Sequence, residues 1–227
     1  MMMLRNLAFN LVFYIGSVIY VSTAVLVAAV VPRLARWVPE GWSHFHRWCV
    51  VHILGIKVVI EGAPSDIPVL YALKHESFFE AIDLPTLLPY PAMFAKRELF
   101  DIPGWGRAAA SYGAIPVARD QGAKTLRAMM TLARQRVAEG RPLAIFPEGT
   151  RVAHGTRPEL KSGFAGIYKL MGLPIVPVAV KSGPVYHRRW KQVGGTILIR
   201  FGEPVPPGLA REEAEARVHA GINALND

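Results

Sequence analysis

The chain has 227 residues, 52% of them hydrophobic, and a formal net charge of +9. This length suits one medium-sized domain with its own core and room for an appended segment. Positive charge on so apolar a chain indicates an anionic membrane surface and argues against a nucleic-acid binder, which does not ordinarily carry a long apolar segment. The single cysteine, Cys49, excludes an internal disulfide and fits a reducing compartment.

The long apolar segment is residues 7–31, with Arg5 before it and Arg33 and Arg36 after it. As a helix it would be about 38 Å long, enough to cross a hydrocarbon core of roughly 30 Å with tilt. It is longer than the apolar region of a signal peptide, and residues 27–32 offer no Ala-x-Ala cleavage site. The basic residues after it predict that the rest of the chain is cytoplasmic, whether the segment spans the bilayer or bends within one leaflet.

Residues 43–54 have the composition of a second helix, which Gly55 would end. Such a helix could lie at the membrane interface or pack as in a soluble protein, and the sequence leaves both open. His44 and His46 point to different helix faces, and no Asp or Glu accompanies them. Together with His52, they are interpreted as interfacial or structural residues.

Downstream of Gly55, short apolar runs bounded by turn residues alternate with stretches of helical spacing. We expect strands at 56–60, 67–73, 92–95, 111–117, 143–146, 173–180 and 196–201, and helices at 79–88, 121–139, 165–171 and 211–225. This alternation predicts an α/β fold, in which helices flank a largely parallel central sheet and loops at the strand ends form the site. The aromatic and basic loop at 181–191 suits lipid headgroups or is an ordinary solvated loop.

His75 and Glu80 are five residues apart, just after the apolar run 67–73. Within one regular helix they would point roughly 140° apart, so they can meet only if His75 lies on a strand-to-helix turn. Glu80 in the first helical turn would then accept a hydrogen bond from one ring nitrogen, leaving the other as a base toward a substrate hydroxyl. Taken alone, the motif is also what an ordinary helix start would show. It is no zincin site, because Phe79 stands where the second histidine is required.

A second stretch that carries chemistry is Phe-Pro-Glu-Gly-Thr-Arg at residues 146–151, at the end of a buried run. A turn on Pro and Gly brings backbone N–H groups and Arg151 into a cleft, where a guanidinium can bind phosphate through two hydrogen bonds. Glu148 would then be partnered or would orient a ligand hydroxyl. Lys96 and Arg97 could meet an anion, although such a pair is usually a solvated surface feature.

Four motifs in order over residues 56–205 resemble those of the glycerolphosphate acyltransferase family. The matching segments are, in chain order, residues 75–80, 113–119, 146–151 and 175–178. The family's first motif is His-x4-Asp, so Glu80 stands where the family has Asp. The second is a Gly followed at a distance by Arg, the third is present whole, and the fourth is an apolar stretch about a proline.

The resemblance implies transfer of a fatty acyl group from a thioester on acyl carrier protein or coenzyme A to the sn-2 hydroxyl of lysophosphatidic acid, giving phosphatidic acid. His75 would be the general base and Glu80 would orient its ring. The implied phosphate-binding residues are Arg119, Arg151, Lys96, Arg97 and Lys161, and the implied substrate-contacting or motif residues are Ser77, Gly113, Glu148, Gly149, Thr150 and Pro177. No metal or bound cofactor is required, and no nucleic-acid partner is expected.

On this interpretation, residues 1–55 are a membrane-embedded or interfacial helical segment, and residues 56–227 are the catalytic domain, on the cytoplasmic side of a bacterial inner membrane. Membrane lipid, the acyl donor and lysophosphatidic acid are the expected partners. Another lysolipid acceptor, such as a lyso-ornithine lipid, would make the Arg119 and Arg151 assignments wrong. A second alternative is a non-catalytic lipid-binding protein, for which Glu80 is the only hint in the sequence. A third is a hydrolase, which would release thiol from the thioester without any acceptor.

Overall fold

A seven-stranded sheet in the order β1-β7-β6-β2-β5-β3-β4 forms the centre of the molecule. The computed structural model of the chain describes residues 2–117, 123–187 and 190–226. The strands are β1 Lys57–Glu61, β2 Leu70–Leu73, β3 Ala92–Lys96, β4 Ile115–Val117, β5 Leu143–Ile145, β6 Ile175–Lys181 and β7 Thr196–Phe201. Neighbouring strands are parallel except β6 and β7, which are antiparallel. The predicted α/β class with a largely parallel sheet is therefore confirmed.

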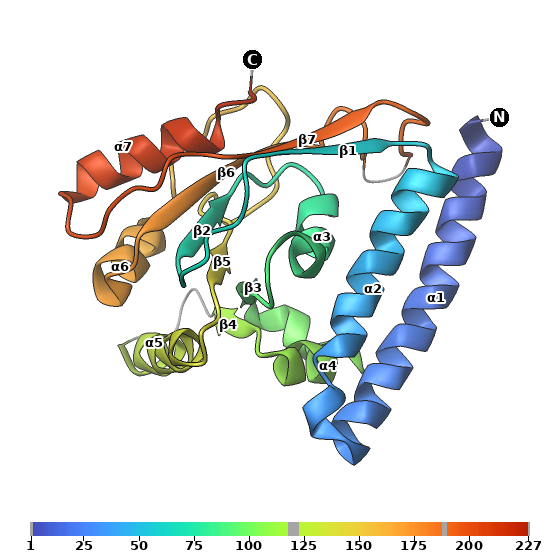
Figure 1. Cartoon of the computed structure of the whole chain (residues 1–227), viewed down its shortest axis with the longest axis horizontal. Coiled ribbons are helices and arrows are strands. Elements are labelled where there is room, and N and C mark those ends of the chain that lie inside the picture. The colour runs from blue at the N-terminus through green and yellow to red at the C-terminus, as the bar shows by residue number, and fades with distance from the viewer. Residues whose placement is uncertain (1, 118–122, 188–189, 227) are drawn as a thin grey trace.

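Helices cover both faces of this sheet (Figure 1). They are α1 Met2–Val30, α2 Trp37–Trp48, α3 Phe79–Leu87, α4 Trp105–Tyr112, α5 Ala123–Ala138, α6 Ser162–Met171 and α7 Arg211–Ile222. Strand β2 shows how the two layers arise, because successive side chains of a strand point to opposite faces. Tyr71 and Leu73 enter one core with α1, α2 and α3, whereas Leu70 and Ala72 enter the other with α5, α6 and α7.

Around α4, one predicted strand boundary is wrong and one helix was not predicted. The strand expected at 111–117 begins only at Ile115, because Ser111 and Tyr112 complete the helix α4. Gly113 ends this helix with a φ of 92°, a conformation that glycine adopts without strain. The helix itself was not predicted, because it is short and the turn residues Pro103 and Gly104 directly before it indicate a loop.

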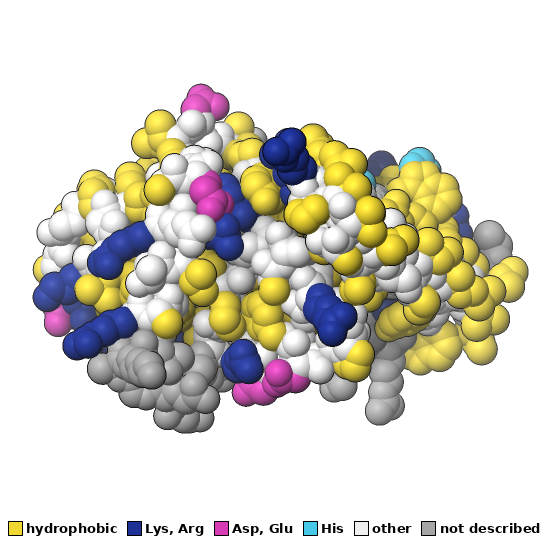
Figure 2. Space-filling model, turned by 90° about the horizontal axis from the view of Figure 1, so that it is seen from below, with side chains coloured by type: hydrophobic (Ala, Val, Ile, Leu, Met, Phe, Trp, Pro, Cys, Tyr) yellow, Lys and Arg dark blue, Asp and Glu magenta, His cyan; other side chains and the backbone are white. Residues whose placement is uncertain are grey.

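The N-terminal helix α1 presents two different faces. Its buried residues are Asn6, Phe9, Phe13 and Ala24, while most of its other large apolar side chains are exposed. Figure 2 shows hydrophobic side chains gathered over the end of the molecule formed by α1 and α2. Its length and composition would allow α1 to cross a membrane, although a signal sequence or a soluble core helix passes the same test. The exposed apolar face of this helix thus supports membrane association.

Helix α2 lies between α1 and α3 and packs against both (Figure 1). It starts at Trp37, earlier than predicted, and continues into a π-helical turn at Cys49–Ile53. Arg47 forms an ion pair with the buried Asp83 of α3, and the Ser43 and Thr86 hydroxyls are 2.6 Å apart. These contacts are those of a helix that packs as in a soluble protein, one of the two interpretations that the sequence left open.

His46 of α2 is a buried structural residue. Its Nε2 lies 2.8 Å from the Tyr186 hydroxyl, and the rings of Phe9 and Phe13 surround it. The loop that carries Tyr186 is held in turn by Asn6, whose amide exchanges two 2.8 Å hydrogen bonds with the backbone of Lys191. Tyr186 and Lys191 are thus buried, so these two residues of the 181–191 loop pack against the protein.

The protein should become less stable in acid because of His46. Burial of this side chain lowers its pKa from 6.5 to about 3, and the charges of Lys191 and Arg47 lower the pKa further in the same direction. Below pH 6.5 the unfolded chain binds a proton at this position that the folded chain refuses. The free energy of unfolding should therefore decrease by about 1.4 kcal/mol for each pH unit between about 6 and 4. Chemical unfolding of a His46→Gln variant should lack this component, whereas the exposed His52→Gln should keep it; equal slopes for wild type and His46→Gln would refute the assignment.

Candidate active site

His75 and Glu80 meet across the corner between β2 and α3. Strand β2 ends at Leu73 and α3 begins at Phe79, so His75 lies on the turn and Glu80 in the first helical turn. The distance from His75 Nδ1 to Glu80 Oε1 is 3.1 Å. The contact expected from the sequence is present, and the extra methylene of Glu80, compared with Asp, does not prevent it.

Glu80 is completely buried, and hydrogen-bond donors surround its carboxylate. Oε1 accepts from the backbone N–H groups of Glu76 at 2.5 Å and Ser77 at 2.6 Å, and Oε2 accepts from the hydroxyls of Ser77 at 2.9 Å and Ser182 at 2.8 Å. Burial raises the pKa of Glu80, but its hydrogen bond and charge interaction with His75, together with the backbone N–H of Ser77, outweigh burial and lower the pKa overall. The ionised carboxylate accepts Nδ1–H of His75, so Nε2 is left as the basic nitrogen.

The 146–151 segment holds His75 from the other side. The His75 ring stacks on Phe146, with 4.1 Å between the ring centroids, and its backbone N–H donates to Glu148 Oε2 at 3.1 Å. Its carbonyl accepts from Val152 N–H at 2.8 Å. In the part of the chain that the structure describes, no group hydrogen-bonds Nε2, and the side chain is 15% exposed. The imidazole is thus fixed in orientation, and within the described residues its Nε2 has no hydrogen-bond partner.

Glu148 is turned away from solvent and is partnered by protein groups. Its Oε1 accepts from Lys74 Nζ at 2.7 Å, and both side chains are almost completely buried. Lys74 Nζ also donates to Thr156 O and Asn223 Oδ1, each at 2.8 Å. Of the two roles expected for Glu148, the structure shows the partnered one. Lys74, which the sequence reasoning left without a role, forms a buried anchor for the segment.

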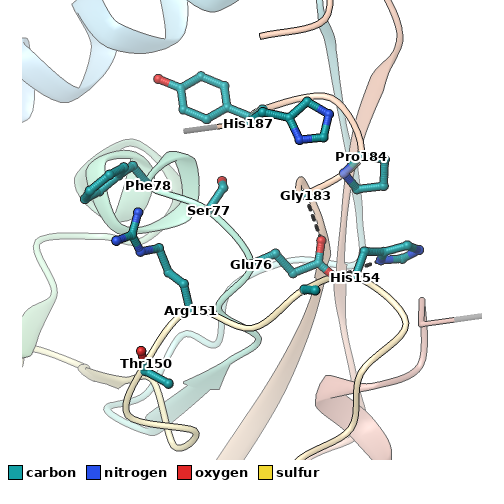
Figure 3. Close-up of a pocket in the computed structure, with 11 residues that line it drawn as sticks. Glu76, Ser77, Phe78, Thr150, Arg151, His154, Gly183, Pro184 and His187 are labelled. Atoms are coloured by element: carbon teal, nitrogen blue, oxygen red, sulfur yellow. Dashed lines mark hydrogen bonds and ion pairs between the residues drawn. The ribbon is translucent and has the colours of Figure 1, made fainter. Parts of the chain in front are cut away.

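A cavity of about 460 Å³ opens beside this corner (Figure 3). Its lining residues are Glu76, Ser77, Phe78, Thr150, Arg151, Ala153, His154, Gly183, Pro184, Tyr186 and His187. The Arg151 guanidinium lies over the Phe78 ring at 3.8 Å from its centroid, which holds this cation at the cavity wall. His75 itself is not a lining residue, but the next two residues in the chain, Glu76 and Ser77, line the wall, so the cavity lies beside the turn that carries His75.

The structure does not gather all the predicted cations around Arg151. Lys96 and Arg97 are exposed at the end of β3, and Lys161 is exposed just before α6. None of these three lines the cavity, so their predicted convergence with Arg151 is not observed. Arg119 lies outside the described residues.

The remaining motif residues divide between the cavity and the framework. Ser77 and Thr150 line the cavity. Gly149 adopts a φ of 68° within the turn that leads to Arg151. Gly113 and Pro177 are structural: Gly113 ends α4, and Pro177 lies in β6 so close to Gly202 and Gly221 that neither position leaves room for a larger residue without a shift.

Sequence reasoning missed the residues that connect separate segments around the cavity. Glu76 Oε1 lies 2.8 Å from His154 Nδ1, and its Oε2 accepts from the backbone N–H groups of Ser182 and Gly183. Ser182 and Gly183 directly follow β6, a neighbour of β2 in the sheet. Because carboxyl ends of parallel strands lie at one edge, that position after the predicted strand at 173–180 was an available signal. Nothing in the sequence pairs Glu76 with His154.

Comparisons with known proteins all identify acyltransferases as similar to this chain. The model of the family described as Acyltransferase matches residues 55–181. The chain is 26% identical over 225 residues to the 1-acyl-sn-glycerol-3-phosphate acyltransferase of Pseudomonas aeruginosa, covering 97% of this chain and 86% of that protein. It is 27% identical over 218 residues to the human 1-acyl-sn-glycerol-3-phosphate acyltransferase alpha, covering 92% and 76%. The fold is similar to the crystal structure of the 1-acyl-sn-glycerophosphate acyltransferase of Thermotoga maritima, with a TM-score of 0.75, 24% identity, and coverage of 99% and 98%.

Proposed function

The chain belongs to the acyltransferase family, and we propose that it transfers a fatty acyl group from an acyl thioester to the sn-2 hydroxyl of 1-acyl-sn-glycerol 3-phosphate, forming phosphatidic acid. The observation that carries this proposal is the His75–Glu80 pair beside a cavity that contains Arg151. The similarity to 1-acyl-sn-glycerol-3-phosphate acyltransferases of Pseudomonas aeruginosa and human supports the choice of acceptor. Acyl carrier protein or coenzyme A would carry the acyl group.

His75 acts as the general base in the proposed reaction. An alcohol is too weak an acid to ionise at neutral pH, so Nε2 takes the hydroxyl proton as the oxygen attacks the thioester carbonyl carbon. Collapse of the tetrahedral intermediate breaks the carbon–sulfur bond, and the thiolate receives the proton back from the imidazolium. Glu80 stabilises the imidazolium and keeps Nδ1 protonated. The reaction uses no metal or bound cofactor, since the thioester is already an activated acyl group.

Arg151 binds the acceptor phosphate in this proposal. A guanidinium donates two parallel hydrogen bonds to a phosphate, whereas a lysine ammonium offers a point charge. In Arg151→Lys, loss of the second bond and of the stacking on Phe78 should raise KM for lysophosphatidic acid about tenfold and change kcat much less. The matched control is Arg97→Lys, which alters the same residue type outside the cavity. Equal KM values for wild type and Arg151→Lys would remove Arg151 from the phosphate site.

The reaction is tested by incubating the detergent-solubilised protein with an acyl thioester and lysophosphatidic acid, while free thiol and lipid product are followed together. Acceptor-dependent thiol release with diacyl product is the expected result. Thiol release without acceptor would identify a hydrolase, and release only with a phosphate-free lysolipid, such as a lyso-ornithine lipid, would overturn the proposed acceptor.

We also propose that α1 lies in the cytoplasmic leaflet of a bacterial inner membrane with its exposed apolar face toward lipid. Both ends of α1 contact the rest of the protein, through Asn6 and Lys191 near one end and through Val21 and Gly104 nearer the other. A perpendicular span that kept these contacts would pull α4 and part of the sheet into the hydrocarbon, where loop backbone is costly. Residues 56–227 then remain in water as the catalytic domain.

A further inference from the structure

A second carboxylate, Glu76, is adjacent in the chain to the proposed base and does not belong to the His75–Glu80 pair. Its side chain is 1% exposed, and both oxygens are used. Oε1 pairs with His154 Nδ1 at 2.8 Å, and Oε2 accepts from Ser182 N–H at 2.9 Å and Gly183 N–H at 2.8 Å. One carboxylate therefore joins the β2–α3 corner, the segment after Arg151 and the loop after β6.

Glu76 poses an electrostatic problem for a cavity that takes a phosphate. In Figure 3, Arg151 lies on one side with Phe78, His154 lies on the opposite side, and Glu76 is between them. A carboxylate in this wall repels a phosphate dianion that binds to Arg151, because like charges at short range are poorly screened away from bulk water. Among the described residues, His154 is the single basic side chain that contacts Glu76.

We propose that His154 is a positioning residue that makes the cavity selective for a phosphate-bearing acceptor, by holding the Glu76 carboxylate on the side away from Arg151 and offsetting its charge. This proposal rests on the function proposed above and adds a residue that sets acceptor specificity. The His154 N–H offsets the carboxylate in either protonation state of the ring, since Nδ1 donates to Oε1 in both.

His154 is a cleaner position to test than Glu76 itself. Ser182 connects the two carboxylates, because its N–H donates to Glu76 and its hydroxyl donates to Glu80. Removal of the Glu76 side chain would therefore disturb the proposed catalytic pair. A His154→Ala variant leaves Oε2 on its two backbone donors and exposes only the Oε1 charge.

The test measures dissociation constants of glycerol 3-phosphate and of glycerol, together with KM and kcat for lysophosphatidic acid. His154→Ala should weaken glycerol 3-phosphate binding and raise KM by about tenfold, with glycerol binding unchanged and kcat within about twofold of wild type. Adding Glu76→Gln to His154→Ala should restore both values, because the amide oxygen can still accept from Ser182 and Gly183 while the charge is gone.

His219→Ala is the matched control. Its Nε2 lies 3.3 Å from Arg157 O and 3.2 Å from Pro158 O, so it supports the same segment after Arg151 without a carboxylate partner. We expect its KM to equal that of wild type. If His154 only supports the loop, His219→Ala will raise KM in the same way and Glu76→Gln will rescue nothing.

The binding measurements separate this proposal from the proposed reaction. Unchanged glycerol 3-phosphate binding in His154→Ala overturns it, as does a wild-type protein that binds glycerol 3-phosphate no more tightly than glycerol. A protein that shows the expected binding pattern but no transfer to lysophosphatidic acid would overturn the reaction and keep the role of His154.

Discussion

His75→Ala should lower kcat for acyl transfer by about 10²- to 10⁴-fold, the range that a positioned general base contributes. The fold should survive, because the ring is partly exposed and the donors from Glu76, Ser77 and Ser182 to the Glu80 carboxylate remain. Free thiol release with lysophosphatidic acid measures the rate, and thermal unfolding checks the fold. His44→Ala, an exposed histidine on α2, should retain full activity. A His75→Ala protein that keeps more than about a tenth of the wild-type rate would exclude His75 as the base.

Glu80→Ala should also be nearly inactive, for a different reason. Without the carboxylate, Nδ1 loses its acceptor, and the buried donors from Glu76, Ser77 and Ser182 lose theirs. Each unsatisfied buried donor costs about 1–3 kcal/mol, so this variant should lose stability as well as rate. His75→Ala should lose rate alone, and the contrast in melting temperature distinguishes a base from the residue that orients it. An active Glu80→Ala variant would overturn the orienting role.

The sequence predicted the His75–Glu80 contact because both partners lie within one strand-to-helix corner, where local geometry decides which side chains meet. The apolar run before His75 indicates a buried strand, and Phe79 opens a helical pattern, so one arrangement lets the residues touch. Glu80, one methylene longer than Asp, reaches the His75 ring from the same corner.

Contacts between distant segments could not be derived in the same way. The convergence of Lys96 with Arg151 was implied by the family resemblance. Lys96 follows β3 and Arg151 follows the neighbouring strand β5, yet Lys96 is exposed and does not line the cavity. Glu76 and His154 are 78 residues apart in sequence and meet only because three loops share one edge of the sheet. Charge type and spacing carry no information about which side chains of neighbouring loops meet.

Lys74→Met should be strongly destabilising, because it leaves the Glu148 carboxylate buried without its cation. Lys74 Nζ has three acceptors for its three protons, Glu148 Oε1, Thr156 O and Asn223 Oδ1, at 2.7, 2.8 and 2.8 Å. Removing one partner of a buried pair typically costs about 3–5 kcal/mol. Chemical unfolding in detergent should show a loss of this size, while the exposed Lys169→Met on α6 should unfold like wild type.

The double variant Lys74→Met, Glu148→Gln separates the cost of the unpaired Glu148 charge from the loss of packing by the Lys74 side chain. Replacing both members of a buried pair removes the uncompensated charge, so part of the lost stability should return. Activity should recover less than stability, since Glu148 Oε2 also accepts the His75 backbone N–H and a glutamine must turn its carbonyl oxygen to that donor. A Lys74→Met protein within about 1 kcal/mol of wild type would show that Thr156, Asn223 and solvent accommodate Glu148 alone. A double variant no more stable than Lys74→Met would assign the loss to the packing of the lysine side chain.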